Sequence, residues 1–116
     1  MNTFIIFMAV IIIIFRIMRI VALYLMNKHY KKIIRHFGEV NQVDKAIEEL
    51  GELVEELEKY GLNCFDKEKA KGEIIDVYNM LMQLLIIFNI SKKEIGYGMG
   101  KKNMRTLKRI KEGYYE

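Results

Sequence analysis

The sequence predicts an all-α protein, and three observations support this prediction. The 116 residues include no proline, the residue least tolerated inside a helix. The eight glycines lie mostly at the ends of periodic apolar segments, where helices commonly stop. Apolar residues recur at steps of four and three, the spacing of one helix face. We therefore expect a helical hairpin with flanking helices, forming a four-helix-type bundle on oligomerisation.

Composition divides the chain into two parts, residues 1–26 and residues 27–116. The first part is apolar except for Asn2, Thr3, Arg16 and Arg19. The second part mixes charged and apolar residues as a soluble domain does. Its 90 residues are few for a self-sufficient core, since domains of this size bury only roughly 60–65% of their surface. We therefore expect a homo-oligomer, either a dimer or a tetramer.

Two interpretations of the N-terminal apolar segment stay open. Residues 4–15 form an unbroken apolar run that is too short to span a bilayer, and extending the run to Met26 includes Arg16 and Arg19. The segment is either a membrane anchor or translated sequence upstream of a natural start at Met26. Basic residues follow the run and none precedes it, so an anchor would leave residues 27–116 in the cytoplasm. Both interpretations predict a cytoplasmic functional part, and membrane contact only if residues 1–26 are present.

The first two helices of the soluble part are predicted from their ends and their apolar spacing. Residues 29–37 are expected to form a short helix that stops near Gly38. A second helix is expected over residues 41–60, with Asn41 as N-cap and Gly61 just beyond the C-terminus. Its predicted buried face consists of Val43, Ile47, Leu50, Val54 and Leu57.

A third helix is expected over residues 67–89, with Asp66 as its N-cap. Its predicted buried face consists of Ala70, Ile74, Val77, Leu81, Leu84 and Phe88. Ser91 and Glu94 have the spacing of a capping box that opens a further helical segment. Three closely spaced glycines are expected to interrupt that segment before a basic helix from about Lys101: Gly96, Gly98 and Gly100.

The net charge of +4 and the isoelectric point of about 9.1 do not by themselves indicate a nucleic-acid partner. The positive charge is densest at residues 28–35 and 101–111, while the middle of the chain is strongly acidic. Basic tails of this kind are more often solvated or phosphate-contacting than nucleic-acid grooves, so we expect no nucleic-acid partner. The single cysteine, Cys64, fits a reducing compartment.

Pairs of carboxylates on the second and third helices are the main functional candidates. Glu49 and Glu52 lie three residues apart, as do Glu73 and Asp76. At about 100° per residue, each pair sits beside the apolar face of its helix. An antiparallel hairpin would bring the pairs together, and their repulsion would need a counter-charge. Oxygen ligands without Cys or His favour Mg²⁺ or Mn²⁺, and Mg²⁺ in turn indicates a phosphate-containing substrate.

Two further observations bear on this interpretation. Gly51 and Gly72 lie beside the acidic pairs, at a cost of about 1 kcal/mol each relative to alanine in a helix interior. They suggest close backbone approach next to the carboxylates. The alternative is that residues 48–58 form an ordinary solvated acidic face, since glutamate is common on helix surfaces.

From about residue 36 to residue 110 the sequence resembles the MazG-like branch of the all-α NTP pyrophosphohydrolases, especially its compact single-domain forms from phages and Gram-positive bacteria. The family pattern is E-E-x-x-E, a spacer of about 12–28 residues, then E-x-x-D. Here it reads Glu48-Glu49-x-x-Glu52, twenty intervening residues, then Glu73-x-x-Asp76. The resemblance implies Mg²⁺-dependent hydrolysis of an NTP or dNTP to the monophosphate and pyrophosphate, clearing non-canonical or surplus nucleotides. A dUTP/dCTP or phosphoribosyl-ATP pyrophosphatase is an alternative within the superfamily.

The resemblance also implies roles for individual residues. Glu49, Glu52, Glu73 and Asp76 would be metal ligands, and Glu48 would be a further ligand or would orient the attacking water. Glu48 and Glu52 are therefore the catalytic candidates, because a carboxylate not fully used by the metal can accept the proton of that water. Candidate substrate-binding cations lie on the second helix and on one face of the last helix: Lys45, Lys102, Arg105 and Arg109.

A rival prediction comes from a different class of protein. If the acidic helices are merely solvated, the chain would be a non-enzymatic helical interaction protein, tethered to a membrane if residues 1–26 form an anchor. The basic face of the last helix would then be an ordinary solvated surface. Hydrolysis of nucleoside triphosphates separates the two predictions.

Overall fold

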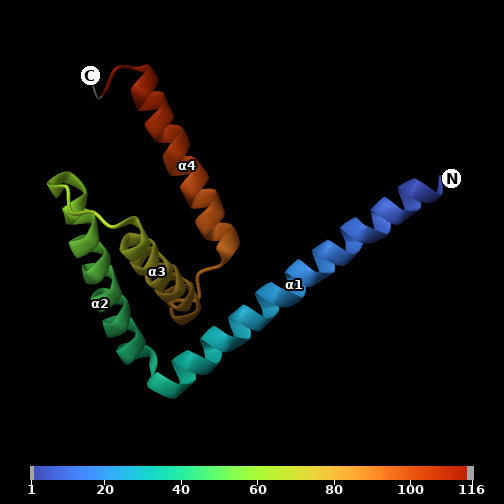
Figure 1. The fold of residues 1–116 in the computed structure, drawn as a ribbon, viewed down its shortest axis with the longest axis horizontal. Coiled ribbons are helices and arrows are strands. Elements are labelled where there is room, and N and C mark those ends of the chain that lie inside the picture. Colours follow the sequence, from blue (N-terminus) through green and yellow to red (C-terminus); the bar gives the residue numbers. More distant parts are fainter. Residues whose placement is uncertain (1, 115–116) are drawn as a thin grey trace.

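The computed structural model describes residues 2–114, and all its regular structure is helical (Figure 1). Four α-helices cover most of the described residues: α1 (Thr3–Phe37), α2 (Glu39–Glu58), α3 (Lys67–Ile87) and α4 (Lys92–Lys111). A 3₁₀ turn, η1 (Lys59–Leu62), follows α2. The predicted all-α class is confirmed.

Helix α1 is much longer than the helix predicted over residues 29–37. It runs unbroken from Thr3, with Asn2 accepting a hydrogen bond from the backbone N–H of Phe4 at 3.1 Å. No proline or glycine lies between the apolar segment and the first basic residues, so nothing stops the helix from continuing through Met26. The predicted stop at Gly38 is confirmed, and its φ of +89° is a conformation that favours glycine.

Helix α2 departs from the prediction at both ends. It begins at Glu39, and Asn41 lies inside its first turn, where the Asn41 Nδ2 donates to the carbonyl of Phe37 at 2.7 Å. Asn41 is therefore not the N-cap, because the sharp turn at Gly38 starts the helix earlier. At the other end the chain tightens into η1, and Gly61 lies within it. The left-handed residue is Asn63, with φ of 59°, since asparagine tolerates that conformation better than most residues.

The caps of α3 and α4 match the sequence. Asp66 accepts hydrogen bonds from the backbone N–H groups of Glu68 (2.9 Å) and Lys69 (3.3 Å). Ser91 and Glu94 form the reciprocal capping box, with distances of 3.1 Å and 2.7 Å. The hydrogen bond from the Ser91 backbone N–H lowers the pKa of the Glu94 carboxyl, and the Ser91 hydroxyl lowers it to a smaller extent.

The predicted interruption of α4 is wrong. The helix is continuous from Lys92 to Lys111 through all three glycines. Glycine weakens a helix by roughly 1 kcal/mol per position but does not forbid it, and the capping box and the lysine-rich remainder favour the helical state.

Helix α3 ends slightly earlier than predicted, at Ile87, because Asn89 takes a left-handed conformation with φ of 53°.

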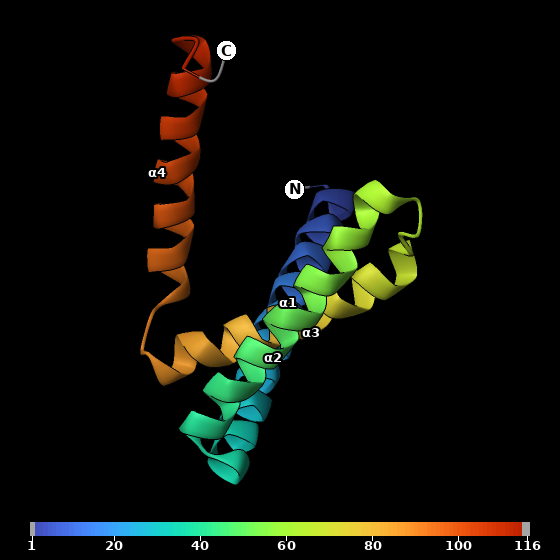
Figure 2. The same ribbon diagram turned by 90° about the vertical axis from the view of Figure 1, so that its left-hand side faces the viewer.

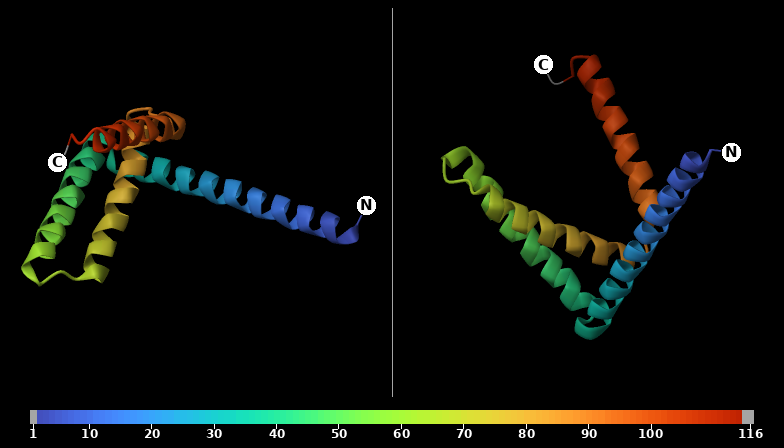
Figure 3. Two further views of the ribbon diagram at one scale, coloured as in Figure 1. Left: turned by 90° about the horizontal axis from the view of Figure 1, so that it is seen from above. Right: turned by 45° about the vertical axis from the view of Figure 1, so that its right-hand side comes forward.

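Helices α2 and α3 form an antiparallel hairpin, and the C-terminal third of α1 packs across its open end (Figures 1 and 3). The Tyr30 hydroxyl donates to Asn79 Oδ1 at 2.7 Å, which ties α1 to α3. Ile34 is buried at this junction. Helix α4 turns away from α3 by 116° and stands apart from the hairpin (Figure 2).

The face of α2 that packs on α3 is not the predicted apolar one. Gln42, Ala46 and Glu49 are buried against α3, whereas Ile47 is 64% exposed. The remaining exposed members of the predicted face are Leu50, Val54 and Leu57. On α3 the prediction is right for Ala70 and Val77, which are buried. A single copy thus buries a small, partly polar seam and leaves its apolar side chains open to one side.

Candidate metal centre

Three glutamates from two helices meet within the hairpin. Carboxylate oxygens of Glu49 and Glu52 on α2 and of Glu73 on α3 all lie within 4.8 Å of one another. Glu49 is buried, with 8% exposure, Glu73 is half-buried and Glu52 is exposed. The spacing of three on α2 places Glu49 toward α3 and Glu52 on the adjacent flank. The antiparallel hairpin then supplies Glu73 from the other side.

Two carboxylate oxygens in this cluster have no hydrogen-bond donor. Glu49 Oε2 and Glu73 Oε2 are buried and unpartnered. Leaving a buried acceptor unsatisfied costs about 1–3 kcal/mol, and more when the group is charged. Oxygens bound to one octahedral Mg²⁺ are about 3–4 Å apart. Small side-chain rotations would therefore bring the three carboxylates to the spacing that one Mg²⁺ requires. The oxygen donors, their burial and their spacing fit a hard divalent cation.

Lys45 is the basic residue that contacts the glutamate cluster. Its Nζ lies 2.8 Å from Glu49 Oε1 and 3.1 Å from Glu48 Oε1. Hydrogen bonds to Glu49 and then to Glu48 raise the pKa of the Lys45 ammonium above its ordinary value. One ammonium therefore offsets part of the negative charge, and it leaves the Oε2 atom of Glu49 unpartnered.

The uncompensated negative charge of the cluster affects the pKa of Glu52. The negative charge of Glu49 raises the pKa of the Glu52 carboxyl, with smaller contributions from desolvation and from Glu73. Like charges held this closely disfavour full ionisation. A bound divalent cation would reverse the effect by favouring the ionised carboxylate.

Two predicted site residues lie outside the cluster. Asp76 is exposed on α3 one turn beyond Glu73, and Glu48 is exposed on α2 and pairs with Lys45. The close backbone approach suggested for Gly51 and Gly72 is wrong, because a Cβ at either position would meet nothing within 4 Å. Both glycines face open space, whereas Ala46 on α2 and Ala70 on α3 are buried.

The predicted cations of α4 are not brought to the glutamates within one chain. Lys102 and Arg105 line a shallow hollow of about 290 Å³ together with Gly98 and Lys101. Arg109 lies over the ring of Tyr114, 5.1 Å from its centroid. Because α4 does not pack on the α2–α3 hairpin, this basic face is separate from the carboxylates of the same copy.

Glu56, which the helical spacing places on the same flank of α2 as Glu49, also contributes to the partly buried seam. Glu56 Oε2 is buried and unpartnered, while its Oε1 accepts from Lys59 Nζ at 2.6 Å. That hydrogen bond raises the pKa of the Lys59 ammonium. Glu56 follows Glu49 by seven residues, two helical turns along the same face. The family pattern assigns it no role, so it was not among the predicted site residues.

No family model, curated protein or solved structure matches this chain.

Proposed function

We propose that this protein is a Mg²⁺-dependent nucleoside triphosphate pyrophosphohydrolase that works as a homo-oligomer. The observation that carries the proposal is the cluster of Glu49, Glu52 and Glu73, with two buried carboxylate oxygens that have no donor. The motif spacing, which resembles that of the MazG-like enzymes, supplies the substrate class. A solvated acidic face would not account for a glutamate buried to 8% exposure between two helices.

The three clustered glutamates would hold the metal, and Asp76 would complete the ligand set from the next turn of α3. When bound, Mg²⁺ would offset the charge of the triphosphate and polarise its phosphoryl oxygens. In the reaction, a water oxygen attacks the α-phosphorus and the bond to the bridging oxygen of the pyrophosphate breaks. Glu48, one residue before Glu49 and outside the cluster, would accept the proton of that water.

Lys45 would have two partners in this scheme. Without metal, its ammonium binds the carboxylates of Glu48 and Glu49. A divalent cation on Glu49 would displace it, because two positive charges cannot share one carboxylate without repulsion. The released ammonium would then face the substrate phosphates, and Glu48 would be freed to act on the water.

The apolar side of the hairpin would be covered by a second copy. At about 100° per residue, Leu50 and Val54 lie on the flank of α2 opposite Glu52. Ile74 and Leu81 likewise lie on the flank of α3 opposite Asp76. Since the glutamates converge on one side of the hairpin, the apolar flanks of both helices share the other side. These residues are 41–53% exposed in one copy, and two such hairpins would form a four-helix bundle.

The same association would explain the isolated basic helix. Lys102, Arg105 and Arg109 cannot serve the carboxylates of their own copy while α4 stands apart from the hairpin. In a homo-oligomer, α4 of one copy would supply these cations to the triphosphate held by its partner. The complete site would then need two copies.

The test is to incubate the full chain, purified in neutral detergent, with a panel of NTPs and dNTPs and Mg²⁺. We expect monophosphate and pyrophosphate in equal amounts. Glu52→Gln and Asp76→Asn should reduce turnover sharply. Glu68→Gln, an exposed glutamate paired with Lys71 at 3.7 Å, is the matched control and should retain it. Absence of product from every nucleotide, or unchanged turnover in Glu52→Gln, would favour the helical interaction protein.

A further inference from the structure

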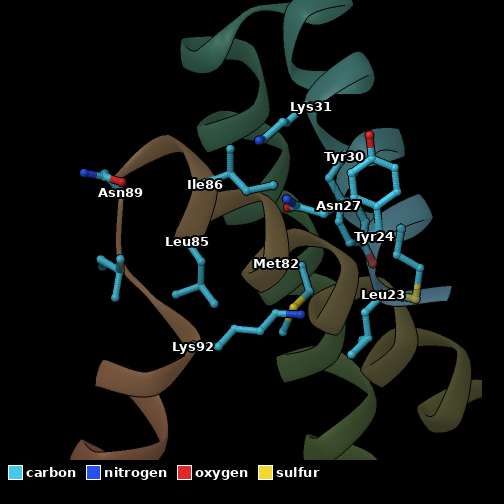
Figure 4. Close-up of a pocket in the computed structure, with 12 residues that line it drawn as sticks. Leu23, Tyr24, Asn27, Tyr30, Lys31, Met82, Leu85, Ile86, Asn89 and Lys92 are labelled. Atoms are coloured by element: carbon cyan, nitrogen blue, oxygen red, sulfur yellow. The ribbon is translucent and has the colours of Figure 1, made fainter. Parts of the chain in front are cut away.

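A second site lies at the other end of the hairpin, where α1 meets the C-terminal end of α3. A cavity of about 520 Å³ opens there between α1, α3 and the start of α4 (Figure 4). Its nearest α3 residue, Met82, is nine residues from Glu73, or about 13 Å along the helix. The cavity is therefore distinct from the glutamate cluster.

The cavity has an apolar wall and a cationic opening. Leucine, isoleucine and methionine side chains make the wall, among them Leu23, Met82, Leu85 and Ile86. Lys31 and Lys92 extend into it from opposite sides (Figure 4). No aspartate or glutamate is among the described residues that line it, and neither lysine makes an ion pair within residues 2–114. Apolar walls with two unpaired cations suit an amphiphile that carries a negative charge.

The position of the cavity on α1 indicates which amphiphile. Residues 4–26 of α1 are apolar except for Arg16 and Arg19, and almost all of them are exposed. α1 is long and apolar enough to cross a membrane, with a mean hydropathy of 2.7 over its most apolar window. Thr3 to Met26 spans about 36 Å, against a hydrocarbon thickness of about 30 Å. The cavity begins at Leu23, at the point where the apolar segment gives way to the basic residues from Lys28 onward.

The two arginines of the apolar segment, Arg16 and Arg19, also favour an anionic ligand. At about 100° per residue they lie on the same side of α1 as the cavity residues Leu23, Asn27 and Tyr30. Neither makes an ion pair within the described part of the chain. An arginine in an apolar segment is costly unless its side chain reaches the interface or an anionic partner. An anion held in the cavity, one to two helical turns away, would supply that partner.

We propose that α1 anchors the protein in a membrane and that this cavity binds an anionic phospholipid, whose phosphate contacts Lys31 and Lys92 and whose first acyl carbons pack against Leu85 and Ile86. Arg19 would interact with the same headgroup from the membrane side. With the basic residues from Lys28 onward on the cytoplasmic side, the glutamate cluster would lie on that side of the bilayer. The proposal is independent of the catalytic one, since it uses none of the same residues.

The experiment uses the full chain in neutral detergent and measures lipid retention by native mass spectrometry. Phosphatidylglycerol, phosphatidylcholine and inorganic phosphate are the three probes. We expect phosphatidylglycerol to bind at least about tenfold more tightly than phosphatidylcholine, because each lysine near an anionic headgroup favours binding of the anionic lipid. Equal retention of the two lipids would overturn the proposal. Stronger binding of inorganic phosphate than of the anionic lipid would assign the site to a free anion instead.

Two variants separate the cavity from general surface charge. Lys31→Ala with Lys92→Ala should remove the preference for phosphatidylglycerol. Lys67→Ala with Lys111→Ala deletes the same charge from the far ends of α3 and α4, outside the cavity lining, and should retain the preference. Leu85→Trp fills the cavity without a change in charge and should reduce retention of the anionic lipid. If the control pair loses the preference as fully as the cavity pair, the site is refuted.

The anchor itself has a separate readout. Intact mass of the natively expressed protein, recovered from the membrane and soluble fractions of a cell lysate, should show residues 1–26 and a membrane-bound chain. A chain that begins at Met26 and stays soluble would refute the proposal, because Leu23 and Tyr24 of the cavity wall would be absent.

Discussion

The two long sides of the α2–α3 hairpin differ in the kind of partner that they lack. One side gathers the carboxylates of Glu49, Glu52 and Glu73 and leaves two oxygens without a donor. The other side exposes apolar side chains such as Ile47 and Leu50. The first deficit is electrostatic, and a small cation would meet it. The second is hydrophobic, and a surface of matching area would be needed to cover it. On the proposed function, one copy of this chain would therefore be an incomplete unit.

The largest effect is expected on the apolar side. Leu50→Asp places a charge where the second hairpin would pack, and each buried leucine contributes about 1.5–3 kcal/mol to such an interface. We expect the oligomer to dissociate and turnover to fall to background, because α4 of the partner would no longer reach the site. Sedimentation in a neutral detergent measures the association.

Glu58→Lys is the control for Leu50→Asp, since it changes charge at the exposed end of α2. It should leave both association and turnover intact. A Leu50→Asp protein that remains oligomeric and active would show that the apolar side is not the interface.

The next effect is expected on the acidic side. Glu49→Gln removes the buried ligand charge while it keeps the shape of the side chain. Turnover should fall by about 100-fold or more, as expected when a charge-stabilising group is lost from a metal site. The rise in melting temperature on addition of Mg²⁺ should disappear as well. If Mg²⁺ stabilises Glu49→Gln as much as it does the native protein, the cluster is not the metal site.

A smaller effect on the melting temperature is expected for Glu52→Gln, with opposite signs in the absence and presence of Mg²⁺. In metal-free protein the charge of Glu49 raises the pKa of Glu52, so the folded state binds this proton more readily than the unfolded chain. The stability from this group is fully present below the unfolded pKa and is lost as pH rises through the folded pKa. Glu52→Gln should therefore raise the melting temperature of metal-free protein at neutral pH and reduce its gain on acidification. With saturating Mg²⁺ the order should reverse.

The contrary result is also informative for that variant. If Glu52→Gln lowers the melting temperature equally with and without Mg²⁺, carboxylate repulsion is not significant in the cluster. Glu55→Gln, on the outer surface of α2, should change the melting temperature little under either condition.

The smallest effect is expected for Lys45→Met. This change removes the ammonium that pairs with Glu48 and Glu49 but keeps an unbranched side chain. Without that competitor Mg²⁺ should bind a few-fold more tightly, while the KM for the nucleotide should rise. Calorimetric titration of Mg²⁺ and steady-state kinetics measure the two changes. Weaker Mg²⁺ binding in Lys45→Met would show that the ammonium organises the site rather than competing for it.

Local sequence determined most of the secondary structure. Asp66 and the Ser91–Glu94 capping box were predictable because a cap depends on residues within one turn. The carboxylate pairs could be placed on their helices for the same reason, since a helix fixes the direction of a side chain from its spacing. The errors at Asn41 and at the glycines of α4 arose where a neighbouring feature, the turn at Gly38 or a strong cap, outweighed the local preference.

Only the tertiary structure decided which faces meet. The apolar spacing of α2 is the strongest pattern in the sequence, yet the hairpin buries Gln42, Ala46 and Glu49 instead. Spacing defines a face but not the element that covers it, and here the buried faces of α2 and α3 include the small residues Ala46 and Ala70. The same reason separates Glu73, which joins the cluster, from Asp76, which does not. The sequence alone determined the chemistry of each helix, and packing determined which chemical groups share a site.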